Sequence, residues 1–212
     1  MSPEPDDTRF YNDLEASLAE LWRQLGRGAA DRRSAMHTVQ LATTGADDGL
    51  PRVRTLVLRG VEPEQRRLRL HTDRRSRKVA ELAVCPRVEL CAYDPGAKIQ
   101  VRARGSAEIL VGPAADAAWS ASEPGSRICY GAPHAPGSLL DDPHDGDIPR
   151  ALPDLPESDK PADEPAESGR AHFAVLLITV SGLDWLYLAA RGHRRASFDW
   201  VDGHWQGHWR AP

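Results

Sequence analysis

The feature that most constrains the fold is a series of strand-length runs joined by connections too short for crossover helices. Turn-forming Gly, Asp or Pro residues stand between most of these runs. Parallel neighbours need crossovers of a dozen or more residues, so the runs predict antiparallel pairing and a mainly β fold, a β-barrel with flanking helices rather than a parallel sheet. The expected strands are 37–44, 52–60, 66–72, 87–93, 99–110, 172–181, 184–190, 195–201 and 204–209.

Helical periodicity is confined to three segments. Apolar residues recur at helical spacing over residues 8–26 and predict an amphipathic N-terminal helix, with Gly26 and Gly28 as its stop. Shorter helices are expected over 76–84 and 114–121. The longest of these helices is expected to lie across the sheet.

Length and charge narrow the class of protein. At 212 residues the chain can bury a core as a single domain, 1–212, without disulfides or structural metal. Its three cysteines form no C-x-x-C pair and indicate neither a disulfide framework nor a metal site. The formal charge is −4, of which residues 141–170 carry −7, so the rest carries +3. A mildly basic body suits a small anionic ligand better than a polyanion and argues against a dedicated nucleic-acid binder, which needs a much larger basic surface.

Residues 141–170 differ from the rest of the domain. They contain ten acidic residues, six prolines and no periodic apolar face, a composition typical of a disordered insertion. We expect either a solvated linker or an acidic lid over a basic site.

Targeting signals are not evident in the sequence. Residues 1–7 lack the basic and apolar regions of a signal peptide. The longest apolar stretch, 174–180, is far shorter than the roughly 20 residues that span a bilayer. A soluble, cytoplasmic protein with no membrane partner is therefore expected.

Two basic clusters suggest a site for a phosphorylated ligand. Basic residues alternate along the run 52–59, which places guanidinium groups on one face of a strand. The second cluster, 71–78, leads into the helix expected after Ser76, whose free N–H groups and dipole favour an anion. Charge-assisted hydrogen bonds would add roughly 1.5–3 kcal/mol each. A solvated strand edge with a basic helix cap explains the same spacing equally well.

Four blocks of residues occur in a fixed order along the chain. They are Arg54-x-x-x-x-Arg59; His71-Thr72-x-x-x-Ser76-Arg77-Lys78; Gln100-Val101-x-x-x-Gly105-x-Ala107-Glu108; and Trp185 followed by Arg191-x-His193-x-Arg195. In order and internal spacing they resemble the FMN-binding split barrels of the pyridoxamine 5′-phosphate oxidase group, in a divergent, oxidase-like branch. The resemblance covers nearly everything from residue 37 onward except the acidic segment. It implies an antiparallel Greek-key split barrel with FMN as cofactor.

The resemblance also implies how FMN would be held. A phosphate needs positive charge and several donors, and a donor near the pyrimidine edge stabilises the charge that reduction places there. The implied phosphate ligands are Arg54, Ser76, Arg77 and Lys78. Residues implied along the ring and ribityl chain are Thr55, Leu56, Val57, Leu58, Arg59, His71 and Thr72, and those at the ring edges are Gln100, Arg195 and Trp185. Taken singly, Trp185 also fits a core position, Gln100 a strand face and Arg195 an ion pair.

The activity that the resemblance implies is oxidation of a small amine or alcohol, pyridoxamine or pyridoxine 5′-phosphate among them. A hydride passes to flavin N5, and dioxygen reoxidises the flavin. Arg191 and His193 match the family's substrate-contacting pair and are the implied catalytic residues, because an imidazole can exchange a proton near neutral pH. Arg59 and Ser126 complete the implied substrate contacts.

One departure from the family pattern concerns the substrate's phosphate. Where the family has a Tyr and an Arg, this chain has Trp119 and the small or acidic residues Ser122 and Glu123. A carboxylate beside a dianion is unfavourable in a desolvated pocket, so phosphate recognition there would depend on Arg127.

The sequence leaves alternatives open for the oligomeric state and for the function. The family implies a homodimer with FMN at the interface, and Trp200, Trp205 and Trp209 are candidate anchors; the alternative is a monomer whose tryptophans fill one barrel. Other possible functions are a flavin reductase-like enzyme that uses NAD(P)H and a non-catalytic FMN carrier or sensor. A haem-binding split barrel, suggested by several C-terminal histidines, has no need for the 71–78 cluster.

Overall fold

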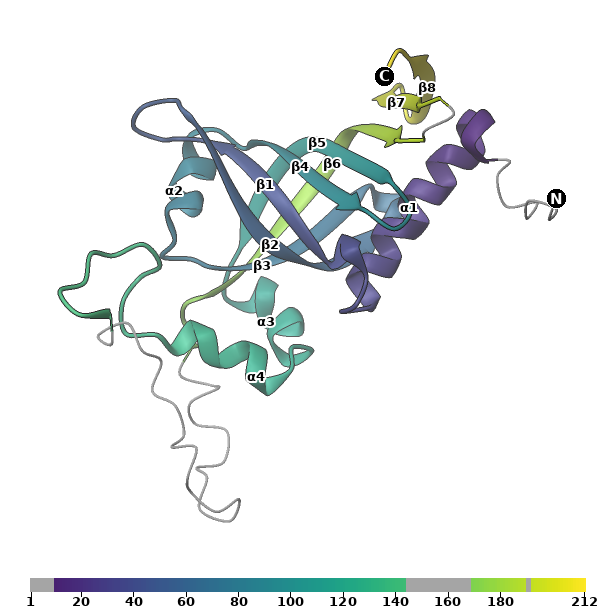
Figure 1. Ribbon diagram of the computed structural model, residues 1–212. Coiled ribbons are helices and arrows are strands. Elements are labelled where there is room, and N and C mark those ends of the chain that lie inside the picture. Colours follow the sequence, from purple (N-terminus) through teal and green to yellow (C-terminus); the bar gives the residue numbers. More distant parts are fainter. Residues whose placement is uncertain (1–9, 144–168, 190–191) are drawn as a thin grey trace.

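The computed structural model describes residues 10–143, 169–189 and 192–212 (Figure 1). Within them, one antiparallel sheet has the order β3-β2-β1-β4-β5-β6-β7-β8, and pairing of β3 with β6 closes the first six strands into a barrel. The order β4-β1-β2-β3 is a Greek key, as expected. The strands are β1 (Thr38–Thr44), β2 (Pro51–Glu62), β3 (Arg67–Asp73), β4 (Arg87–Asp94), β5 (Ile99–Leu110), β6 (Phe173–Tyr187), β7 (Arg194–Val201) and β8 (His204–Arg210).

Alternation along the strands separates the barrel interior from its outer face. In β1, Val39 and Leu41 are fully buried, whereas Gln40 between them is exposed. The same two-residue period in β4 and β5 adds further apolar side chains to one continuous core. Polar and charged residues of these strands therefore share the outer face.

The β6 strand differs from the prediction of two strands, 172–181 and 184–190. The prediction leaves a gap at residues 182–183, yet the strand continues through it. β5, its partner, has a register shift between Arg104 and Gly105. A Cβ on Gly105 would lie 2.2 Å from the backbone carbonyl oxygen of Thr179, so glycine allows β5 to approach β6 closely there.

The N-terminal helix α1 runs from Leu14 to Ala30, so both ends lie later than the predicted 8–26. Asp13 is the N-cap, and its carboxylate accepts from the backbone N–H of Ala16 at 2.7 Å. The glycines expected to stop the helix lie inside it, and Asp31 follows as C-cap. The apolar face of α1 packs on the barrel beside β2 (Figure 1).

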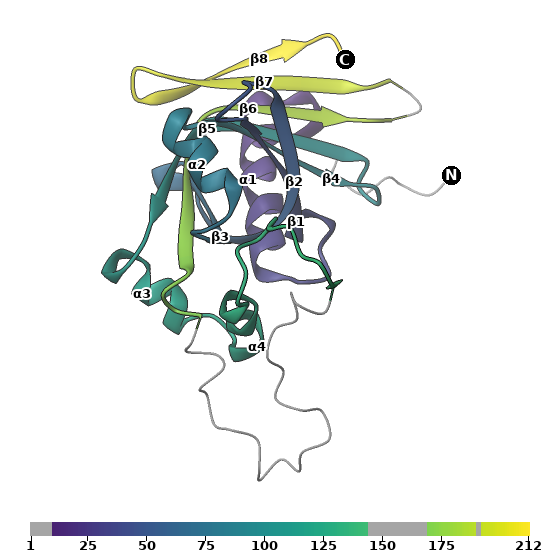
Figure 2. The same ribbon diagram turned by 90° about the vertical axis from the view of Figure 1, so that its left-hand side faces the viewer.

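The remaining helices are short. The predicted helix 76–84 is α2 (Arg77–Val84), and 114–121 is α3 (Pro113–Ser120). Four were not predicted: η2 (Ala35–His37), η3 (Pro63–Gln65), α4 (Pro124–Arg127) and η4 (Ile128–Gly131). Figure 2 shows α3 and α4 at the opposite end of the molecule from the β7–β8 hairpin. In the described residues, no helix has the length and apolar character to cross a membrane.

The β7–β8 hairpin extends the sheet beyond the closed barrel. Its turn, Asp202-Gly203, has positive φ at both residues, as the sequence predicts for a tight hairpin. Trp205 packs toward Trp22 of α1, whereas Trp209 is 43% exposed. Most of the acidic segment predicted over 141–170 lies outside the described residues.

Candidate phosphate and flavin site

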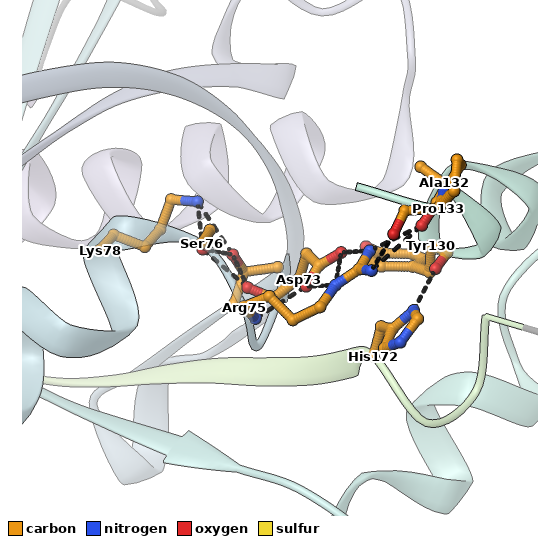
Figure 3. Close-up of polar contacts among 9 residues, drawn as sticks. Asp73, Arg75, Ser76, Lys78, Tyr130, Ala132, Pro133 and His172 are labelled. Atoms are coloured by element: carbon orange, nitrogen blue, oxygen red, sulfur yellow. Dashed lines mark hydrogen bonds and ion pairs between the residues drawn. The ribbon is translucent and has the colours of Figure 1, made fainter. Parts of the chain in front are cut away.

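A small cluster of donors lies at the N-terminus of α2. Lys78 Nζ donates to Thr72 Oγ1 and to Ser76 Oγ, both at 3.0 Å, and the two hydroxyl oxygens are 3.3 Å apart (Figure 3). Ser76 is the N-cap residue, as predicted, but its hydroxyl does not cap the helix; it donates to the Asp73 carbonyl at 2.7 Å. We call Thr72, Ser76 and Lys78 the cradle.

The electrostatics of the cradle favour an anion. Thr72 and Ser76 are buried and Lys78 is half-buried, and the structure gives Lys78 no ion pair within its described residues. Burial, followed by the nearby Arg54, lowers the pKa of the Lys78 ammonium, while Glu81 and Asp73 act in the opposite direction. A desolvated ammonium beside two hydroxyls and free helix N–H groups is the donor set that a phosphate monoester requires. The cradle therefore fits the phosphate of FMN.

Arg54 does not join the cradle directly. Its guanidinium forms an ion pair with Glu81 of α2 at 2.7 Å and donates to the Thr43 hydroxyl. The buried Glu81 carboxylate also accepts from Thr43 at 2.5 Å. Arg77, the fourth implied phosphate ligand, has an exposed side chain. The structure thus brings together Thr72, Ser76 and Lys78 and leaves Arg54 beside them, held by a carboxylate.

The residues implied along the flavin ring divide between the two faces of β2. Leu56 and Leu58 face the core, and Thr55 and Val57 alternate with them on the outer face. Arg59 stands at a register shift in β2, and its carbonyl accepts a long bond from Arg69 at 3.4 Å.

His71 on β3 is the most strongly perturbed titratable group of the implied set. Its ring is edge-on to Phe173 with centroids 4.8 Å apart, and its Nε2 is buried without a partner in the described residues. Burial, with smaller effects of Arg59 and Arg69, lowers the pKa of His71 to about 4. The imidazole is therefore neutral at physiological pH and offers a buried polar atom to a ligand.

The two residues implied at the pyrimidine edge share one row of the outer face. Gln100 of β5 pairs with Leu186 of β6, which pairs with Arg195 of β7. Arg195 is held by Asp184, which accepts from its Nη2 at 2.9 Å and also from Arg102 at 3.1 Å. Arg195 thus forms the ion pair given as the alternative to a flavin contact, and its guanidinium stays on the same face as Gln100.

Trp185 occupies a core position. It is fully buried between its neighbours in β5 and β7, and the ring of Tyr11 stacks near it with centroids 5.8 Å apart. Its indole N–H has no partner among the described residues. Within one chain the indole therefore faces aromatic side chains of the N-terminal segment.

The implied catalytic pair is only partly described. His193 is exposed and, with Arg195, Tyr11 and Trp209, lines a cavity of about 290 Å³. Arg191 lies outside the described residues. This cavity is remote from the cradle, because α2 and the β7–β8 hairpin lie at opposite ends of the barrel in Figure 1. One chain therefore does not bring His193 to the cradle.

The implied substrate-phosphate edge lies in α3 and α4. Trp119 is buried, and Arg127 lies over its ring at 5.3 Å while donating to the carbonyls of Ser120 at 2.8 Å and Ser122 at 2.9 Å. Arg127 thus stabilises the C-terminal end of α3. Ser126 belongs to α4, and its carbonyl accepts from the Cys129 thiol at 3.1 Å.

Several residues that shape the site were missed by the sequence reasoning. Glu81 follows Lys78 by one helical turn, a spacing that could have placed it beside the cradle. Asp184 could have been found from its pairing position opposite Arg102 on the outer face. Arg75 had no such signal, because its distant partners, the carbonyls of Ala132 and Pro133, lie in a segment with no predicted structure.

Comparison with known proteins agrees with this geometry. The family described as "Pyridoxamine 5'-phosphate oxidase, FMN-binding domain" matches residues 19–111. Pyridoxine/pyridoxamine 5'-phosphate oxidase 2 of Arabidopsis thaliana is 39% identical over 128 residues, which cover 55% of this chain and 64% of that protein. The corresponding oxidase of Alkalilimnicola ehrlichii is 32% identical over 121 residues, covering 57% of this chain and 61% of that protein. Both matches thus span less than two thirds of the relative's length.

A solved structure extends the similarity over the whole chain. The pyridoxamine 5'-phosphate oxidase-related, FMN binding protein of Nostoc punctiforme aligns with a TM-score of 0.68 and 25% identity, and the alignment covers 100% of both chains. The cofactor is FMN, in agreement with the family description and the cradle. Residues 19–111 thus match the FMN-binding domain of the pyridoxamine 5′-phosphate oxidase family, and the chain as a whole has the split-barrel fold of a related FMN-binding protein.

Proposed function

We propose that the protein is an FMN-dependent oxidoreductase that oxidises a small amine or alcohol. The observation that carries the proposal is the cradle, in which a half-buried ammonium and two hydroxyls surround a place for one phosphate at a helix N-terminus. When bound, FMN would supply the two-electron acceptor for such an oxidation, with dioxygen to reoxidise it. Names of the relatives support this reaction class, and the substrate is inferred from this chain alone.

We propose a homodimer in which each flavin site draws on both chains. Thr72 of the cradle pairs with Ala174 of β6, whereas the Gln100–Arg195 row crosses β6 at Leu186, twelve residues further along that strand, or about 40 Å at the usual rise per residue. The cradle and the Gln100–Arg195 row therefore cannot both flank one flavin through a single chain. An isologous pairing of outer faces would bring one chain's cradle toward the partner's row.

The substrate side favours a molecule without a phosphate of its own. Arg127 is engaged with the carbonyls of α3 and the ring of Trp119, and Glu123 is an exposed acid beside it. The donors that a second phosphate would need are therefore weak at this edge. His193 and Arg59 would then orient the substrate's amine or hydroxyl, His193 by holding or taking its proton.

The test uses a matched pair of substrates. FMN-loaded protein receives pyridoxamine or pyridoxamine 5′-phosphate anaerobically, and the flavin absorbance is followed before and after air is admitted. We expect both compounds to bleach the flavin and the absorbance bands to return in air. Because one well-formed phosphate contact is worth about tenfold and this edge lacks one, kcat/KM for pyridoxamine 5′-phosphate should exceed that for pyridoxamine by less than about tenfold. Bleaching only by NAD(P)H would replace the oxidase with a reductase. Stable bands under all three donors would leave an FMN carrier.

A further inference from the structure

A continuous set of hydrogen bonds joins the cradle to the segment after α4 through one side chain, Arg75 (Figure 3). The Arg75 guanidinium lies against the Asp73 carboxylate, with Nη2 at 2.7 Å from Oδ2 and Nε at 3.1 Å from Oδ1. On its other side, Nη1 and Nη2 each donate to the Ala132 carbonyl at 3.1 Å. Arg75 therefore connects two segments that are far apart in sequence.

We call Arg75, with its contacts to Asp73 and Ala132, the clamp. Asp73 links the clamp to the cradle. Asp73 ends β3 and is buried, and its carbonyl accepts the bond from the Ser76 hydroxyl. Its carboxylate also accepts from the Arg75 backbone N–H at 2.8 Å. On one side, the turn 73–76 thus holds the Ser76 hydroxyl in its place in the cradle. On the other side, it fixes the orientation of the Arg75 guanidinium. A ligand that orders this turn would also order the fork.

The segment on the far side of the clamp is the one that carries Ser126. It continues into η4, where the Cys129 thiol donates to the Ser126 carbonyl and the Tyr130 carbonyl lies 2.8 Å from His172 Nδ1. Burial raises the pKa of both the Cys129 thiol and the Tyr130 hydroxyl, and the nearby Arg59 guanidinium acts in the opposite direction on both. The segment therefore lies within electrostatic reach of the implied substrate contact Arg59.

We propose that Arg75 is a positioning residue that couples occupation of the cradle by a phosphate to the placement of the segment 126–133. The inference rests on the proposed function only in naming the FMN phosphate as the occupant. Arg75 itself contacts neither cofactor nor substrate. It acts by holding the Ala132 carbonyl, and so the substrate-side segment, at a fixed place relative to the cradle.

Alkylation of Cys129 by iodoacetamide, located by peptide mass spectrometry, reports on this segment. The full chain is labelled alone, with FMN and with riboflavin, which lacks the phosphate. We expect FMN to slow labelling of Cys129 severalfold and riboflavin to leave it unchanged. In Arg75→Ala, labelling without ligand should be about tenfold faster, the effect of roughly one net hydrogen-bond contribution, and FMN should no longer slow it.

Two variants make the experiment specific. Arg74→Ala removes an exposed neighbouring guanidinium and should behave as wild type. Arg75→Lys keeps the charge but not the two-sided fork, and should resemble Arg75→Ala. Loss of a positive charge alone would raise a thiol pKa and slow alkylation, so faster labelling reports release of the segment.

The outcomes separate the inference from the proposed function. If FMN binds, as flavin fluorescence would show, yet Cys129 labels equally with and without it, the coupling is wrong. If riboflavin protects Cys129 as well as FMN does, the coupling does not pass through the cradle and the inference is wrong. Absence of FMN binding would overturn the proposed function, whereas unchanged ligand-free labelling in Arg75→Ala would overturn the clamp by itself.

Discussion

Among single residues, Glu81 has the least expected environment, since its buried carboxylate lies beside a site that selects an anion. It holds Arg54 at 2.7 Å and stands within electrostatic reach of Lys78, where it opposes the lowering of the ammonium pKa by burial. Two charges about 10 Å apart interact by roughly 1–2 kcal/mol at the effective dielectric of a protein surface. Glu81 therefore makes Arg54 structurally ordered and weakens its attraction for a phosphate.

Replacing this charge should strengthen cofactor binding. In Glu81→Gln the amide can still accept a hydrogen bond from Arg54 or Thr43, and we expect FMN to bind about tenfold more tightly, since about 1.4 kcal/mol is a factor of ten. Titration by quenching of flavin fluorescence measures the two dissociation constants. Riboflavin is the control ligand, and its affinity should not change. An equal gain for riboflavin would mean that Glu81 acts on the ring and not on the phosphate.

At the scale of elements, α1 shows how packing overrides a local signal. Gly26 and Gly28 predict a helix end, yet both lie inside α1. Gly28 allows the chain to return closely, because a Cβ there would lie 2.5 Å from the carbonyl oxygen of Met36 in η2. Gly26 has nothing within 4 Å of such a Cβ.

These two glycines form a matched pair for mutation. Gly28→Ala should lower the free energy of unfolding by about 1–3 kcal/mol through overpacking against η2. Gly26→Ala should raise it by roughly 0.5–1 kcal/mol, because alanine restricts the unfolded chain and favours the helix. Urea unfolding of the apoprotein measures both. Equal effects of the two substitutions would show that the approach of Met36 is not tight.

The sequence predicts regular elements better than the contacts between them. Strand alternation identifies most of the barrel. Of the four phosphate ligands that the resemblance implies, Ser76 and Lys78 lie together, because a turn and one helical turn are enough to bring them to Thr72. Arg54 is instead held by Glu81, and Arg77 is exposed. The fusion of the predicted strands 172–181 and 184–190 into β6 depends on the distant strand β5, which pairs with β6 from Val175 to Tyr187. The clamp of Arg75 on Ala132 likewise joins distant segments, and no local pattern encodes such contacts.

For the whole molecule, the separation of the cradle from the β7 row leads to a complementation test. Lys78→Met and Arg195→Ala should each weaken FMN binding by about tenfold or more through loss of a charged donor. When the two variants are mixed and allowed to exchange subunits, about a quarter of the sites should recover wild-type affinity, because half of the dimers are mixed and each has one intact site.

Sedimentation velocity with FMN supplies the assembly measurement, with a dimer expected. A wild-type mixture of differently labelled chains is the control for subunit exchange. If exchange occurs and no tight sites appear, each flavin site lies within one chain. A monomer in the presence of FMN would refute the shared site directly.

The close contact between Tyr130 and Gly169 has a consequence for comparing relatives. A Cβ on Gly169 would lie 2.7 Å from the Tyr130 carbonyl carbon, and His172 also holds the Tyr130 carbonyl. The stretch between Tyr130 and Gly169 thus begins and ends at nearly one point. Loop closure costs only about 0.6 kcal/mol for each doubling of length, so evolution can lengthen or shorten this stretch almost freely. Total chain length is therefore a poor measure of kinship here, and the distance between Tyr130 and Gly169 in space is the feature to compare.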